Sequence, residues 1–159
     1  MNRVATESSY TITLENLNTE KEGINYVLSH DTRLYNISKE SRKFLLELLE
    51  IPNSYRRSFD LIMLPNHNHN TPLTQIKSKE DVVLVELKTT KKKLIDNPKG
   101  FFFGATENEF KLARAFGDKY LFCFVCLHPE ARSFSYLTLS ELEDIIKTKR
   151  TQFQINLKN

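Results

Sequence analysis

The sequence predicts an α/β fold in which helices flank a central mixed β-sheet. Residues 82–88 and 120–127 are apolar almost throughout instead of alternating with polar residues, which is typical of central strands covered on both faces. The segment 106–116 between them opens with helix-capping chemistry and continues with apolar residues three to four positions apart. We therefore expect a strand, a crossing helix and a second strand, with further strands beside them.

Helices are expected where a capping pair precedes apolar residues at helical spacing. Three such pairs occur: Thr19 with Glu22, Thr106 with Glu109, and Ser140 with Glu143. A fourth helix is predicted over 38–50, ended by Pro52, and its apolar face is formed by Phe44, Leu45, Leu48 and Leu49.

Further strands are predicted where short runs rich in β-branched and aromatic residues are bounded by turn formers. They span 10–14, 59–64, 101–103, 134–139 and 153–157. The polar loop 65–74 joins the 59–64 strand to the 82–88 strand and fits a hairpin. If these two strands pair antiparallel, the start of one lies beside the end of the other, which brings Asp60 near Glu86.

Length and composition suit one domain spanning 1–159, because 159 residues with 40% apolar content can bury a single core. We divide it into an N-terminal helical part (1–54), a core (55–127) and a C-terminal helix and tail (128–159). The first residues lack a secretory signal and no run is long enough to span a bilayer, so an intracellular protein is expected. The net charge of +3 permits contact with nucleic acid without requiring it.

Charged residues at the end of the 82–88 strand suggest chemistry. Glu86 and Lys88 share a face because they are two positions apart, and Asp60 offers a second carboxylate. Such oxygens suit Mg²⁺, which serves phosphodiester cleavage, and the carbonyl of Leu87 can add a neutral ligand. Lys88 would place a positive charge beside the metal-bound water or the scissile phosphate, to orient or help deprotonate the attacking water and to steady the phosphate. The alternatives are a solvated acid at Asp60 and a cross-strand ion pair of Glu86 with Lys88.

Basic residues flank this proposed site in sequence. They suit a phosphate backbone, although solvated loop charge is the common alternative. The candidates for nucleic-acid binding are Arg56, Arg57, Lys91, Lys92 and Lys93.

Asp60 followed by Glu86-Leu87-Lys88, a helix and a strand resembles the PD-(D/E)xK nuclease superfamily of restriction-endonuclease-like folds. The segments FDLIML, VELKTT and ATENEFKLARAFGDKYLFCFV resemble, over residues 55–127, the NO VEIN C-terminal-like domain of restriction and defence proteins. One departure is Phe59, which stands where the superfamily pattern has proline.

The resemblance implies a restriction-endonuclease-like sandwich with Asp60, Glu86 and Lys88 as catalytic residues. It implies Mg²⁺ as cofactor, with Mn²⁺ as a substitute, held by Asp60, Glu86 and Leu87. Related nucleases place an acid on the first core helix near the metal, for which Glu22 is a candidate, and Glu109 is a second supporting acid. A capping role accounts for both residues equally well.

The function that these observations predict is a metal-dependent DNA endonuclease of restriction or mobile-element defence. Cutting both strands of a duplex with one site per chain calls for a homodimer or for a place in a larger complex. Two alternatives remain: an inactive nuclease-fold module that binds nucleic acid or protein, and a nuclease acting on RNA or on DNA junctions.

Other motifs receive structural interpretations. Cys123 and Cys126 lie three apart in a predicted strand and face opposite sides, so two buried thiols are expected instead of a zinc or redox site. His67-Asn68-His69 spells HNH but lacks the surrounding metal motif, so a surface loop is expected. Tyr120 is expected to pack with its hydroxyl at the rim. Glu80 and Asp81 are fallback acids at the opposite end of the strand from Glu86.

Overall fold

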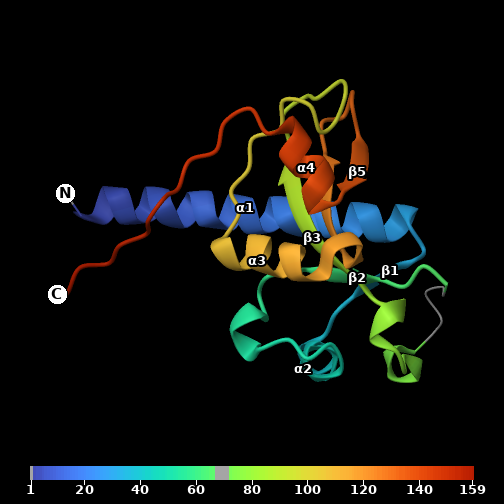
Figure 1. Cartoon of the computed structure of the whole chain (residues 1–159). Coiled ribbons are helices and arrows are strands. Elements are labelled where there is room, and N and C mark those ends of the chain that lie inside the picture. The colour runs from blue at the N-terminus through green and yellow to red at the C-terminus, as the bar shows by residue number, and fades with distance from the viewer. Residues whose placement is uncertain (1, 67–71) are drawn as a thin grey trace.

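One mixed sheet of five strands forms the centre of the molecule (Figure 1). The computed structural model describes residues 2–66 and 72–159, with side chains from Asn16 onward except that of Thr74. The strands follow chain order across the sheet, and only β3 and β4 are parallel. They are β1 (Leu34–Asn36), β2 (Leu61–Met63), β3 (Val83–Thr90), β4 (Tyr120–Cys126) and β5 (Ser133–Leu137). The predicted α/β class with a mixed central sheet is confirmed.

Helices cover both faces of the sheet. The long α1 (Asn2–His30) lies across one face, whereas α2 (Lys39–Leu48), α3 (Glu107–Phe116) and α4 (Leu139–Ile145) pack on the other (Figure 1). Short 3-10 helices occupy Asn53–Tyr55, Leu73–Gln75, Lys79–Asp81 and Gly117–Lys119. Among the residues that the structure describes, no helix combines the length and the apolar character needed to cross a bilayer.

The alternation of side chains along β3 divides the core into two parts. Val83, Val85 and Leu87 point toward α1 and join a cluster with Val27. Leu84, Glu86 and Lys88 occupy the alternate positions, on the face that α3 covers. The acid and the amine of β3 therefore lie between the sheet and α3.

The strongest sequence signals are confirmed. β3 and β4 are the central strands and are parallel, and α3 lies in the connection from one to the other. Thr106 caps α3 in a complete capping box with Glu109, and Ser38 caps α2 through a hydrogen bond from the Ser41 amide. Both cysteines are free and buried, as expected of two apolar thiols in a strand.

Several predicted elements are wrong at the N-terminal side. Residues 10–14 belong to α1 and form no strand, and Thr19 does not start a helix because α1 begins at Asn2. A five-residue β-rich run is a weak signal, and a helix that continues into residues packed on the sheet overrides it. The strand β1 was missed because three residues are too few to show a periodic pattern.

Other corrections concern single faces and ends. Residues 101–103 and 153–157 lie outside the sheet, and the side chains of Phe153, Ile155 and Leu157 are exposed. α4 is capped by Thr138 with Glu141, two residues before the predicted pair, which allows Leu139 and Leu142 to be buried. On α2, Leu46 and not Phe44 belongs to the core.

Asp31 joins the end of α1 to β5. Its carboxylate accepts hydrogen bonds from Arg33 Nε at 2.9 Å and Nη2 at 2.7 Å, and from the Tyr136 hydroxyl at 2.8 Å. The hydrogen bonds from Arg33 lower the pKa of Asp31 to about 2. The contact therefore favours folding as long as the carboxyl is ionised.

We expect Asp31→Asn to lower the free energy of unfolding by about 1 kcal/mol at pH 7, with solvent screening of Arg33 included. Because the folded pKa lies below the unfolded value, this stability is present above about pH 4 and is lost as pH falls toward 2. Urea unfolding measures the effect at pH 7 and at a pH of roughly 2.5, which lies between the folded and unfolded pKa values of Asp31. The exposed Asp96→Asn variant is the control, and an equal loss at both pH values contradicts the expectation.

Candidate active site

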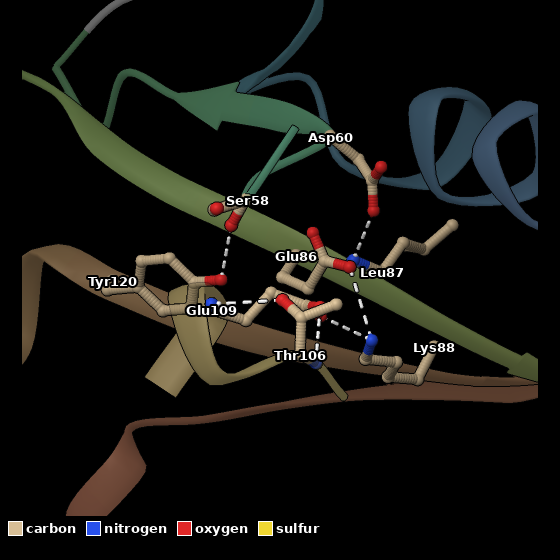
Figure 2. A network of polar contacts seen from close by, with 8 residues as sticks. All are labelled: Ser58, Asp60, Glu86, Leu87, Lys88, Thr106, Glu109 and Tyr120. Carbon is tan, nitrogen blue, oxygen red and sulfur yellow. Dashed lines mark hydrogen bonds and ion pairs between the residues drawn. The ribbon is translucent and has the colours of Figure 1, made fainter. Parts of the chain in front are cut away.

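The antiparallel pairing of β2 with β3 brings Asp60 to the end of β3. The Asp60 amide donates to the Val85 carbonyl at 2.9 Å. Asp60 Oδ2 accepts the Leu87 amide at 2.8 Å (Figure 2). The Asp60 carboxylate thus takes the place of the next backbone acceptor in the hydrogen-bond ladder between β2 and β3. Because N–H and C=O of one strand residue point to the same side, the Leu87 carbonyl is directed toward Asp60 as well.

Lys88 lies between two carboxylates. Its Nζ is 3.2 Å from Glu86 Oε1 and 2.5 Å from Glu109 Oε1, and its side chain is only 12% exposed (Figure 2). The structure therefore holds Glu86 and Lys88 together on one face of β3, as predicted. The ion pair of Glu86 with Lys88 that the sequence left open as the alternative is present, but it lies within one strand, and Lys88 has a second carboxylate partner on α3.

Glu109 has two roles at once. Its Oε2 accepts the Thr106 amide at 2.7 Å and completes the capping box of α3, while its Oε1 contacts Lys88. The two interpretations that the sequence left open for Glu109 are therefore compatible.

Glu86 carries the clearest electrostatic anomaly among the described residues. Its Oε2 is buried and has no hydrogen-bond partner among them. Burial raises the pKa of Glu86 well above its ordinary value, and the charge of Asp60 raises it further. Burial also raises the pKa of Asp60, although the hydrogen bond from Leu87 acts against this.

The amine of Lys88 does not by itself balance the negative charge of Asp60 and Glu86. Burial opposes the charged form of Lys88, but Glu86 and Glu109 outweigh it and raise the pKa of Lys88. Lys88 is therefore an ammonium group whose charge is already shared between two carboxylates. A further cation beside Asp60 and Glu86 would relieve their repulsion.

A cleft of about 280 Å³ opens at the end of β3. Its walls come from α1, from the end of β3 and from the segment that precedes α3. The lining residues are Asn16, Thr19, Glu20, Glu86, Leu87, Lys88, Thr89, Phe102, Phe103 and Gly104.

The acid that α1 contributes to this cleft is Glu20 and not Glu22. Glu22 is exposed, and its carboxylate lies 3.7 Å from Lys91 Nζ outside the cleft lining. Partial burial and the charge of Asp60 raise the pKa of Glu20, while Lys88 lowers it. Gly23 and Val27 face the sheet, and Glu20 lies on the same side of α1 because it precedes them at helical spacing. This placement can be predicted only if the helix is known to start well before Thr19.

The donor set fits a hard cation. Within the described part of the chain, no three His, Cys, Asp or Glu side chains form a preformed metal group. Mg²⁺ does not require one, because it keeps several waters and often takes only one or two protein carboxylates. The orphaned Glu86 Oε2, the Asp60 carboxylate and the Leu87 carbonyl together offer oxygen ligands of the right kind.

Two residues fix the segment that leads into Asp60, and the sequence did not predict this role for either of them. Arg42 Nη1 donates to the carbonyls of Phe59 and Arg56, both at 2.7 Å. The Tyr120 hydroxyl donates to the Ser58 carbonyl at 2.5 Å. Tyr120 is completely buried, so the expectation that its hydroxyl lies at the rim is wrong.

The other predicted residues lie around the cleft and not in its lining. Arg56, Arg57, Lys91, Lys92 and Lys93 are exposed, and Lys93 Nζ lies 2.6 Å from the Glu130 carboxylate. Glu80 and Asp81 are in the 3-10 helix that precedes β3, at the end opposite Glu86. His67, Asn68 and His69 lie outside the described residues.

No protein-family model matches the chain, and no curated protein and no solved structure matches it either. The site is therefore interpreted from its geometry and its chemistry.

We expect Tyr120→Phe to lower the free energy of unfolding by about 1–2 kcal/mol, because it leaves the buried Ser58 carbonyl without its donor. Ser58 is two residues before Asp60, so the loss acts on the segment that positions the carboxylate. Urea unfolding measures the change, with the half-buried Tyr55→Phe as control. Equal stability of the two variants would contradict this role of the hydroxyl.

Proposed function

We propose that this protein is a metal-dependent nuclease of the PD-(D/E)xK kind that hydrolyses phosphodiester bonds in DNA. The observation that carries the proposal is the buried, unpartnered oxygen of Glu86 beside Asp60 and Lys88 at a cleft. Glu86 lines the cleft, and burial raises its pKa; a carboxylate with a raised pKa in a cleft is typical of functional sites.

The order of elements supports the same proposal. The acid before β2, the Glu-x-Lys of β3, the crossing helix α3 and the parallel strand β4 follow one another as the resemblance to restriction-endonuclease-like folds implies. A role in restriction or mobile-element defence belongs to this proposal through the resemblance to the NO VEIN C-terminal-like domain.

Asp60, Glu86 and the Leu87 carbonyl would hold the Mg²⁺, for which Mn²⁺ can substitute. When bound, the metal supplies the positive charge that activates a water and offsets the charge growing on the phosphate. The neighbouring carboxylates raise the pKa of Lys88, so it would act as an ammonium group that stabilises the charge developing on the phosphate. Glu109 orients that amine, and α3 holds Glu109 in place.

The direct test is cleavage of plasmid, single-stranded DNA and RNA in Mg²⁺ or in EDTA. We expect Mg²⁺-dependent cleavage that Lys88→Ala lowers by about 100-fold or more, because a group aimed at the developing charge is lost. Lys111→Ala, which removes an exposed lysine paired with Glu107, is the control and should keep full activity.

Two outcomes would redirect the proposal. Binding of nucleic acid without metal-dependent cleavage would identify a binding module that keeps the site but not the reaction. Cleavage of RNA alone would retain the mechanism and change the substrate.

Removal of the metal tests the site without a substrate. We expect Mg²⁺ at about tenfold its Kd to raise the Tm of the wild type by about 3 °C, since binding to the folded state alone adds about 1.4 kcal/mol. Asp60→Asn keeps an oxygen for the Leu87 amide but loses a half-buried charge. In EDTA this variant should therefore match or exceed the wild-type Tm, and Mg²⁺ should not raise it.

Differential scanning fluorimetry provides this measurement, with Glu107→Gln as a matched loss of an exposed carboxylate. The metal assignment is wrong if Asp60→Asn retains the full Mg²⁺ shift, or if Glu107→Gln abolishes it.

A further inference from the structure

The three consecutive phenylalanines at 101–103 are placed differently. Phe101 and Phe103 pack edge-on against the Phe124 ring of β4, with centroids 5.0 and 5.1 Å apart. Phe102 is 96% exposed. Its ring is therefore not stabilised by hydrophobic burial in the folded chain. The packing of Phe101 and Phe103 fixes the backbone from which this ring projects.

Phe102 lines the cleft that contains Glu86 and Lys88. Phe103, Gly104 and residues of α1 line the same cleft. A side chain at Gly104 would meet no heavy atom within 4 Å, so space remains beside the ring. A flat apolar surface and the charged cluster of β3 therefore border the same volume.

The connection that carries the ring also carries positive charge. Lys91, Lys92, Lys93 and Lys99 are exposed in the segment 91–100 that leads to Phe102. An aromatic face beside a basic segment is the combination that binds single-stranded nucleic acid. Bases inside a duplex are already stacked on both sides, whereas an unpaired base offers a free π face.

We propose that Phe102 is a base-stacking residue and that the cleft takes single-stranded nucleic acid or a single-stranded end. An unpaired base stacks on the Phe102 ring while the adjoining phosphate lies toward Lys88. This inference rests on the proposed function for the fate of the phosphate, but the stacking contact itself can be measured without cleavage. Phe102 then selects substrates by the absence of base pairing and not by base sequence.

The test is fluorescence anisotropy with Ca²⁺ in place of Mg²⁺ and with intact probes verified on gels. The probes are an oligonucleotide of about 12 thymidines, within the usual site size, a fully abasic oligomer of equal length, the matching duplex and an oligouridine that separates RNA from DNA. We expect the wild type to bind the thymidine oligomer about 10-fold more tightly than the abasic one. Phe102→Ala should lose this preference, and Phe102→Trp should keep it.

Ile95→Ala is the matched control, because Ile95 is another exposed apolar residue of the same connection, and it should bind as the wild type does. The stacking role is overturned if Phe102→Ala keeps the preference for thymidine over abasic backbone, or if the wild type shows none. Tighter binding of the duplex than of the thymidine oligomer overturns the assignment to single strands.

The two proposals fail separately. If Phe102→Ala loses the preference but no substrate is cleaved in Mg²⁺, Phe102 remains a stacking residue and the nuclease proposal falls. If cleavage depends on Mg²⁺ and on Lys88 while Phe102→Ala binds all probes as the wild type does, only the stacking inference falls.

Discussion

The amine of Lys88 joins the sheet to the helix that crosses it. Glu86 holds it from the same strand, and Glu109 holds it from α3 while also capping that helix through Thr106. All three charged side chains are nearly buried, so the loss of one partner leaves an uncompensated charge that costs about 3–5 kcal/mol. The end of β3 and the start of α3 are therefore fixed relative to each other by the same atoms that form the candidate site.

This cluster holds more negative charge than the fold itself needs. The half-buried Asp60 lies next to the buried Glu86, and one oxygen of Glu86 has no hydrogen-bond partner among the described residues. Replacing Asp60 with a neutral residue would relieve this repulsion and favour folding. A local cost of this kind is typical of sites whose chemistry requires it, and a cation bound between Asp60 and Glu86 would convert the repulsion into coordination.

Local signals in the sequence predicted the parts of the fold that the site depends on most. The two apolar strands and the capped helix between them are strong signals, and the polar hairpin loop implied the pairing that places Asp60 beside Leu87. Glu20 was missed because the capping pair Thr19 with Glu22 suggested a helix start at Thr19, whereas α1 begins at Asn2. Residues 153–157 alternate as a strand does, yet alternation cannot supply the neighbour with which a strand must pair.

Two packing contacts set the width of the cleft. A Cβ added to Gly23 would lie 2.4 Å from Thr89 Oγ1 and 3.3 Å from Leu87 Cδ2, so the backbone of α1 rests directly on the end of β3. Glu20 lies one turn before this contact and is carried to the cleft by it. On the other side, Phe103 is held against Phe124. A larger residue at Gly23 would move α1 outward and carry Glu20 away from the cleft, while the wall beside Phe103 would stay in place.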